Sequence, residues 1–407
     1  MLTQRAIERF CEMRNYDVRQ SGNGRWIDQK CAADVLTVIA DCICNYEAEN
    51  PGCAFTTADI WYSDYAVENV ELIFKKPGVE SASARSEYDK FFQQPMELLA
   101  NAQVLCKNKW GKRNLYMVGD RSVLEYIALR EQNALFFLKT YIEKVLQDSG
   151  IFPVFEAFFE QQNKQTYQAA KQAFSDFTIR YTRINGVVEC NRIFIKVLNP
   201  LAYYRNARGT EQGRLSEQII TYDMLMYNRN NFRDLYADKP KGITRKEYAA
   251  IHPVKVNEAY YRYQSAKAKR YLRLFNDRNR GGRTEHLEPA HLQDQAIHMH
   301  HIFPESEYPE ICCFLENLIA LTPTQHLGYA HPNGRTQEID EQYQHLLLLS
   351  KADRIRENLT GHAAEKIYEF SNFLRVLSVG FEDDSVWEIR EMDFGSVVHA
   401  INRHYAV

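Results

Sequence analysis

The sequence lacks any long apolar run. No stretch reaches the roughly 18 consecutive apolar residues that a membrane-spanning helix needs. Residues 1–14 carry charged side chains where a secretory signal peptide has its apolar segment. These absences predict a protein that stays in the cytoplasm.

Paired cysteines are also missing. The 407 residues include nine cysteines but no CxxC pair, and the nearest neighbours are Cys42 with Cys44 and the doublet Cys312 and Cys313. An odd, scattered set argues against a disulfide framework and against a four-cysteine zinc site. For the doublet we expect packing instead of metal ligation.

A large net charge is absent as well. The chain has 50 Lys and Arg and 53 Asp and Glu, which gives a formal net charge of −3. The overall composition therefore does not indicate nucleic-acid binding. Between residues 255 and 283, however, nine Lys and Arg are opposed only by Glu258 and Asp277. Such segregation is typical of a surface for phosphates, and a solvated helix face is the alternative. From this segment we expect three DNA-binding side chains: Lys267, Lys269 and Arg270.

The first part of the chain combines predicted helices with a predicted hairpin. Apolar spacing predicts helices within 28–46 and 86–100, the latter with a potential break at Pro95, and a capped helix after residues 56–59. Alternating apolar residues over 103–118 predict a hairpin. Its tip surrounds Trp110 with cations, which we expect to bind DNA: Lys107, Lys109, Lys112 and Arg113. This order resembles the winged-helix family, and a small α+β domain with a solvated turn is the alternative.

The middle of the chain mixes helical and strand-like patterns. Residues 122–174 have mostly helical spacing, and the apolar stretch 187–198 is strand-like. Residues 203–233 are rich in Tyr, Asn and Arg, whose side chains can stack on bases or read guanine and adenine edges. We therefore expect Arg205 and Arg208 to contact DNA, with hydrogen-bonded structure at a domain seam as the alternative.

The most informative segment is 297–326, "IHMHHIFPESEYPEICCFLENLIALTPTQH". A pair of histidines ends a short apolar strand that Pro304 stops, and an asparagine begins a second apolar strand. A helix then follows, with Thr322 suited to cap it and Pro323 at its first position. Strand, loop, strand and helix make a ββα unit. Its chemistry-bearing residues are, in order, His300, His301, Asn317 and His326.

This ordered pattern resembles the HNH, or ββα-metal, nucleases. The family pattern is a ligand followed by His, then Ile-x-Pro, then Asn-Leu, then His or Asn on the helix. Residues 300–304, 317–318 and 326 match it. The resemblance covers 297–326 directly and about 285–360 as a domain, and the stretch 326–340 is similar to restriction endonucleases of this superfamily.

Neighbouring side chains on a strand point to opposite faces, so His300 and His301 cannot have the same role. The resemblance implies that His300 and His326 bind the metal and that His301 activates water as general base. Asn317 is expected to hydrogen-bond the backbone near His301 and to orient its imidazole. Two protein ligands leave positions for water and a phosphate oxygen. We expect Mg²⁺ first because of its supply, although imidazole favours Mn²⁺, Ni²⁺ or Zn²⁺.

Two further histidines stay open as ligands. Nuclease toxins of the family have a third His four residues after the helix ligand, where this chain has Ala330. His331 lies one residue further on, and a straight α-helix would place it off the ligand face. His298 shares a strand face with His300, two residues along the strand.

Together the patterns predict an α+β protein in three parts. These are a winged-helix-like DNA-binding domain (1–125), a mixed α/β middle domain for DNA recognition (126–284), and a ββα-metal (HNH) nuclease domain (285–407) ending in helices at 340–356 and 363–376. The expected function is sequence-specific cleavage of double-stranded DNA by a type II restriction enzyme, with a homodimer as one open arrangement. The alternatives are another HNH nuclease, for phage defence, homing or toxicity, and a non-enzymatic winged-helix protein with a structural metal. A structural zinc would be closed by four protein ligands.

Overall fold

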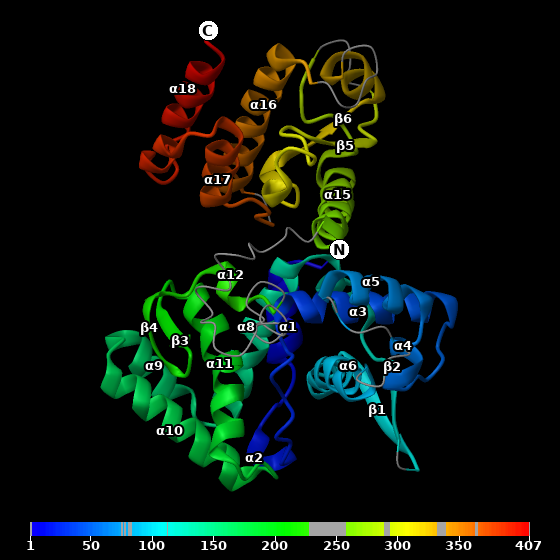
Figure 1. Cartoon of the computed structure of the whole chain (residues 1–407), viewed down its shortest axis with the longest axis vertical. Coiled ribbons are helices and arrows are strands. Elements are labelled where there is room, and N and C mark those ends of the chain that lie inside the picture. Colours follow the sequence, from blue (N-terminus) through cyan, green and yellow to red (C-terminus); the bar gives the residue numbers. More distant parts are fainter. Residues whose placement is uncertain are drawn as a thin grey trace, which may run out of the picture. The chain divides into compact units, whose positions relative to one another are not determined.

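The computed structural model describes residues 2–74, 76, 79, 84–111, 113–227, 258–288, 294–331, 339–362 and 365–406. The chain divides into two compact units, Met1–Val256 and Asn257–Val407, in place of the expected three parts (Figure 1). Helices dominate the described residues, and each of their sheets has two strands, so the fold is α+β as expected. All nine cysteines are free thiols. None of the described helices has the length and apolarity to cross a membrane.

The N-terminal unit opens with helices around a buried central helix, followed by a hairpin. Its elements are α1 (Gln4–Glu12), α2 (Val18–Ser21), α3 (Ala33–Glu49), α4 (Thr57–Trp61), α5 (Asp64–Phe74), α6 (Ala84–Asn101), β1 (Leu105–Trp110) and β2 (Arg113–Val118). The expected cap is present, because the Thr56 side chain accepts a hydrogen bond from the Asp59 amide and Asp59 reciprocates. Helix α6 continues through Pro95, so that break does not occur. Helix α3 is buried on all sides over residues 33–43, which makes it the centre of the core.

The described residues of the second half of this unit, 121–227, are mostly helical. It contains α7 (Arg121–Leu129), α8 (Glu131–Asp148), α9 (Phe152–Gln161), α10 (Lys164–Tyr181), α11 (Val187–Tyr204), β3 (Arg208–Glu211), β4 (Arg214–Ile219) and α12 (Tyr222–Leu225). The strand expected at 187–198 was wrong, since this stretch begins α11. Its buried side chains recur at helical spacing, including Cys190, Phe194 and Val197, whereas Val187 and Val188 are exposed. Packing on one helical face therefore outweighs the strand preference of its β-branched residues.

The core of the N-terminal unit is continuous across residue 125, where a domain boundary was expected. Helix α3 packs against both α7 and α8, and α1 also packs against α8. The Tyr141 ring on α8 lies edge-on to Tyr16 and Trp26, and its hydroxyl donates to the Trp26 carbonyl at 2.9 Å. The segments assigned to a winged-helix-like and a middle domain therefore share one core.

The C-terminal unit is built around a short antiparallel pair of strands. Its elements are α15 (Glu258–Arg280), β5 (His298–His301), β6 (Leu318–Leu321), a π-helix (Gln325–Ala330), α16 (Glu341–Thr360), α17 (Phe370–Phe381), α18 (Phe394–Tyr405), and 3₁₀ turns at Pro309–Ile311, Leu315–Asn317 and Asp384–Glu388. Strand β5 pairs with β6 so that His300 lies opposite Ile319. Helix α15, expected in the middle domain, packs against both strands and belongs to this unit. Helix α16 begins where expected, whereas α17 begins later than 363 and α18 was not anticipated.

A buried polar network supports β6 from the side of α16. The Glu285 carboxylate accepts a hydrogen bond from the Ala320 amide at 2.8 Å, and the Glu285 amide donates to the Ala320 carbonyl at 2.9 Å. The fully buried Lys351 ammonium lies 3.4 Å from Glu285 and donates to the Tyr368 hydroxyl at 2.7 Å. Buried charges persist only when they are paired and hydrogen-bonded, so this network ties the segment before β5 to β6 and α16.

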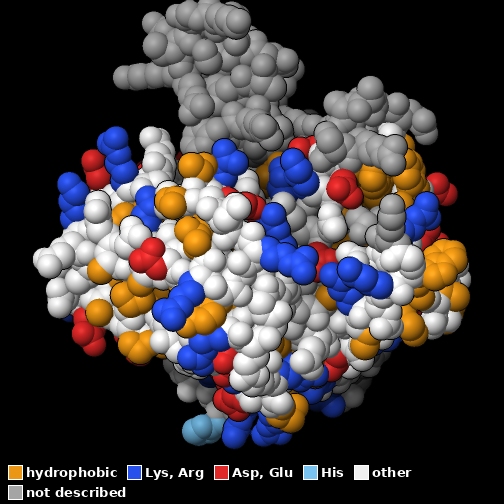
Figure 2. All heavy atoms as spheres, turned by 90° about the horizontal axis from the view of Figure 1, so that it is seen from below, with side chains coloured by type: hydrophobic (Ala, Val, Ile, Leu, Met, Phe, Trp, Pro, Cys, Tyr) orange, Lys and Arg blue, Asp and Glu red, His pale blue; other side chains and the backbone are white. Residues whose placement is uncertain are grey.

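Charge is dispersed over the molecular surface drawn in Figure 2. Lys and Arg side chains on that face are interspersed with acidic and hydrophobic ones and do not form one continuous patch. The side chains described on this face therefore present no single basic surface.

Candidate metal centre and its catalytic surroundings

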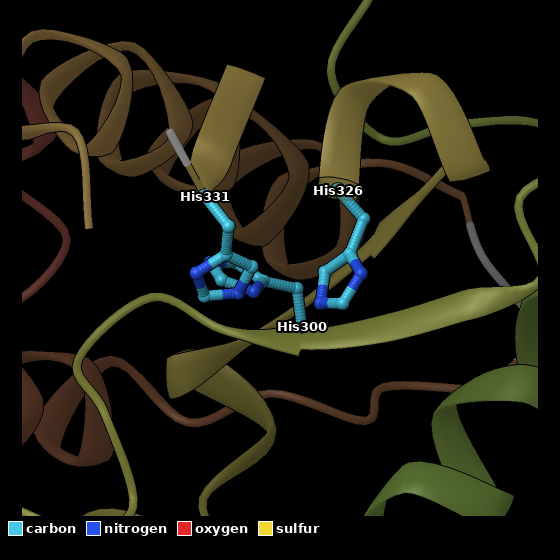
Figure 3. Close-up of side chains that lie close together, drawn as sticks. All are labelled: His300, His326 and His331. Atoms are coloured by element: carbon cyan, nitrogen blue, oxygen red, sulfur yellow. The ribbon is translucent and has the colours of Figure 1, made fainter. Parts of the chain in front are cut away.

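Three imidazoles converge between β5 and the π-helix. His300 comes from β5, His326 from the second residue of the π-helix and His331 from the residue after its end, and their rings point toward one another (Figure 3). One ring nitrogen from each lies within 4.8 Å of the others. The structure thus brings together the two expected ligands and one of the two histidines that the sequence left open.

The π-helix explains why His331 joins the cluster. In a π-helix the hydrogen bonds run from residue i to i+5, so side chains five positions apart lie on one face. His326 and His331 are five apart and face His300, while Gln325 and Ala330 are five apart and both buried. The straight α-helix expected from the sequence is wrong here, because residues 325–330 form a π-helix.

The cluster suits a divalent transition metal. The Nε2 atom of His300 and the Nδ1 atom of His326 are buried and have no hydrogen-bond partner among the described residues. Burial, reinforced by the neighbouring imidazoles, holds the pKa of His300 well below its usual range and lowers the pKa of His326 to about 4. The rings are therefore neutral at physiological pH, and a neutral imidazole nitrogen with no other partner is a good metal ligand.

His298 stays outside this group. Its ring stacks on His326 with centroids 4.6 Å apart and an angle of 15° between the planes. Among the described residues the candidate ligand set therefore has three members. Three protein ligands and one open position are typical of a catalytic zinc site, whereas a structural site is closed by four.

His301 points to the other face of β5, toward α15. Its Nε2 atom lies 2.9 Å from the Cys312 carbonyl oxygen and 3.3 Å from the Ser265 hydroxyl. A carbonyl can only accept, so Nε2 carries the proton and Nδ1 keeps its lone pair. The Glu305 carboxylate lies 3.8 Å from Nδ1.

The protonation state of His301 follows from its surroundings. Burial and the Lys269 ammonium lower its pKa to about 4, against the opposing effect of the Cys312 hydrogen bond. At neutral pH the ring is therefore an uncharged, oriented imidazole that can accept a proton at Nδ1.

Asn317 makes the backbone contacts that the sequence led us to expect. Its side-chain oxygen accepts from the Phe303 amide at 2.8 Å, and its nitrogen donates to the carbonyls of Phe303 and Ile311 at 3.0 and 3.3 Å. Asn317 is fully buried. It therefore joins the end of β5 to the loop whose Cys312 carbonyl orients His301.

Sequence reasoning missed two polar residues beside His301. Ser265 lies on α15, and its hydroxyl donates to Glu305 at 3.0 Å. Glu305 follows the His-His-Ile-Phe-Pro motif directly, so its position was a usable signal. Ser265 lies 36 residues before His301, and only the packing of α15 on β5 brings it there.

The cations expected on α15 differ in their surroundings. Arg270 is exposed and Lys269 is half-buried, whereas the side chain of Lys267 is buried and its ammonium lies 5.3 Å from the centroid of the Tyr263 ring. Lys269 lies one helical turn after Ser265 on the same face of α15. Lys267 is thus a packing residue first, and the other two are the better candidates for phosphate contacts.

The cations expected in the N-terminal unit are partly engaged within the chain. Lys107 forms an ion pair with Glu97 at 2.6 Å, and Arg205 one with Glu143 at 3.0 Å. The Arg208 guanidinium donates to the Ser216 carbonyl at 2.7 Å. Of the other cations expected at the hairpin tip, Lys109 and Arg113 are exposed. Lys112 lies outside the described residues.

Comparisons with protein-family models, with curated proteins and with solved structures return no match for this chain. What can be concluded about its function therefore rests on the geometry of the three-histidine cluster and of His301.

Proposed function

We propose that this chain is a metal-dependent endonuclease of the HNH type that cleaves double-stranded DNA. The observation that carries the proposal is the pairing of two sites on consecutive residues. His300 contributes to a cluster of three imidazoles, and His301 presents an oriented imidazole that can accept a proton at Nδ1. The two side chains leave β5 on opposite faces, and the proposal requires a phosphodiester bound at this end of the strand to approach both.

The chemistry requires a proton acceptor for the attacking water and positive charge for the phosphate. In the proposed reaction the water oxygen attacks phosphorus and His301 Nδ1 takes the water proton. The P–O bond to the leaving sugar oxygen breaks, and that oxygen takes a proton from solvent. The Glu305 carboxylate, 3.8 Å from Nδ1, stabilises the imidazolium that forms. Asn317 and the Cys312 carbonyl keep the ring oriented during the transfer.

The residues that would hold the metal are His300, His326 and His331. A bound divalent ion supplies positive charge for the phosphate oxygens. Since all three ligands are imidazole nitrogens, we place Zn²⁺, Ni²⁺ and Mn²⁺ ahead of Mg²⁺, which prefers oxygen. The sequence led us to expect Mg²⁺ first, with two histidine ligands. A third histidine in the cluster reverses that preference.

The biological role that we propose is that of a type II restriction enzyme. The N-terminal unit is much larger than the ββα unit, and a bare metal-hydrolysis unit does not read sequence because scissile phosphates are alike everywhere. Within that unit, the exposed hairpin tip with Lys109 and Arg113 is the best-placed surface for DNA. We assign it winged-helix-like recognition of the duplex.

A plasmid assay tests the function directly. The full-length chain is stripped with EDTA and then incubated with supercoiled plasmid and Zn²⁺, Ni²⁺, Mn²⁺ or Mg²⁺. We expect discrete linear fragments with at least one metal and none in EDTA. Tight Zn²⁺ binding without cleavage under any of these metals would instead favour the DNA-binding protein with a structural metal. A smear without discrete fragments would favour a nuclease that does not choose its site.

Charge on α15 should set the salt dependence of DNA binding. We expect Lys269→Ala and Arg270→Ala each to weaken binding to all sequences alike. Each should lower the slope of log affinity against log salt by about 0.9, as loss of one phosphate contact does. Fluorescence anisotropy on metal-free protein measures this. Lys267→Ala is the matched control, because its ammonium lies over Tyr263 and its side chain is buried. Equal slopes for all three variants and the wild type would remove α15 from the interface.

A further inference from the structure

Gln325, the residue just before the candidate ligand His326, has an unusual set of hydrogen bonds. It is fully buried. Its side-chain oxygen accepts from the Thr284 hydroxyl at 2.6 Å and from the Thr322 amide at 3.2 Å. Its side-chain nitrogen donates to the His286 carbonyl at 3.0 Å and to the Glu288 carboxylate at 3.3 Å. The full hydrogen-bonding capacity of one amide is thus used at the start of the π-helix.

The segment that holds Gln325 is itself anchored. Glu285 pairs through its backbone and its side chain with Ala320 of β6. The His286 ring lies 2.7 Å from the Ser350 hydroxyl of α16 and 3.0 Å from Glu288. Residues 284–288 are therefore hydrogen-bonded to both β6 and α16, and Gln325 in turn is hydrogen-bonded to them.

A π-helix needs such support because it is rarely the preferred form of a free segment. In an α-helix five residues turn through about 140° beyond a full circle, since one turn takes about 3.6 residues. If residues 325–330 relaxed to an α-helix, His331 would therefore rotate away from His326. The register of the π-helix thus decides whether the third imidazole reaches the cluster.

We propose that Gln325 is a positioning residue for the metal centre. By locking the start of the π-helix to residues 284–288, it holds His326 and His331 on one face, where both can bind the same ion as His300. This inference rests on the metal centre of the proposed function. It assigns to residues 284–288 and Gln325 a role that the HNH-like motif does not contain.

Isosteric replacement tests the role of the amide. Gln325→Met keeps the length of the side chain and removes its four hydrogen bonds. We expect its Zn²⁺ affinity, measured by calorimetry without DNA, to fall about 10–100-fold, the usual cost of losing a residue that orients a ligand. The absorption spectrum of the Co²⁺ form should shift toward that of a site with fewer nitrogen ligands.

Gln344→Met is the matched control. Gln344 also uses its amide in the C-terminal unit, donating to the Ile302 carbonyl at 2.7 Å and accepting from the Tyr405 hydroxyl at 2.8 Å. It has no hydrogen bond to the π-helix in the described structure. We expect wild-type Zn²⁺ affinity in this variant. Equal losses in the two variants, or wild-type affinity in Gln325→Met, would overturn the proposal.

A compensating deletion separates positioning from general stability. Removing the exposed Gly328 from Gln325→Met leaves His326 and His331 four residues apart, a spacing that shares one face in an α-helix. We expect this double variant to regain Zn²⁺ affinity. No gain over Gln325→Met would contradict the proposed role of Gln325 in setting the register of the π-helix.

A milder variant is needed if circular dichroism shows that Gln325→Met does not fold. Thr284→Val removes one of the four hydrogen bonds of the Gln325 side chain. We expect it to bind Zn²⁺ more weakly than the wild type, with a smaller loss than the about 10–100-fold expected for removing all four. A wild-type chain that binds Zn²⁺ but cuts no DNA would end the proposed function and leave this inference standing.

Discussion

Replacing His301 by Ala is expected to lower the rate of DNA cleavage by about 10²–10⁴-fold, the usual contribution of a general base. Metal affinity and DNA affinity should stay within a few-fold of wild type, because His301 faces α15 and lies outside the three-histidine cluster. The measurement is single-turnover cleavage of a duplex oligonucleotide, with Zn²⁺ and DNA binding determined on the same preparations.

The control for this variant is His345→Ala. The His345 ring on α16 hydrogen-bonds Asn402 at 2.8 Å, stacks on Tyr405 and does not belong to the three-histidine cluster. It should cleave at the wild-type rate. A His301→Ala variant that cleaves as fast as His345→Ala would show that another group accepts the proton, and the catalytic assignment would then have to be abandoned.

The second large effect concerns the metal ligands. We expect His300→Ala, His326→Ala and His331→Ala each to reduce Zn²⁺ affinity by at least about 100-fold. Loss of a ligand should cost no less than the 10–100-fold loss typical of the residues that orient ligands. Cleavage should fall in parallel. Calorimetric titration of Zn²⁺ into each EDTA-stripped variant measures the affinity.

His331 is the informative member of this series, because the motif itself accounts only for His300 and His326. His298→Ala is its matched control, since His298 stacks on His326 but does not belong to the cluster. Its affinity should change by only a few-fold. If His298→Ala lost as much affinity as His331→Ala, the site would have four histidine ligands, and the case for a structural metal would gain strength.

Elements with strong local signals were predictable from the sequence. The capping box at Thr56 and the alternation around Gly111 rest on contacts between residues close in the chain, and both appear where expected. The strand pair β5 and β6 likewise follows from two short apolar runs with a loop between them. Such features depend on residues close together in the chain, so they can be predicted from the sequence alone.

Elements decided by packing were less predictable. Residues 187–198 have the β-branched composition of a strand, yet they form α11 because one helical face meets the core. The expected boundary at residue 125 is bridged by the packing of α3 on α7 and α8. Contacts between segments distant in the sequence determine each of these outcomes.

The candidate site shows the same division. The sequence by itself determined the order His300, His301, Asn317 and His326, and the alternation of a strand already assigned the first two to opposite faces. Only the tertiary structure decided that His331 joins the cluster, because its alignment depends on a π-helix held by residues 284–288. It also decided that Ser265 lies beside His301, because α15 packs on β5. A helical register and a helix–strand contact depend on partners far along the chain, and no spacing within a short motif records them.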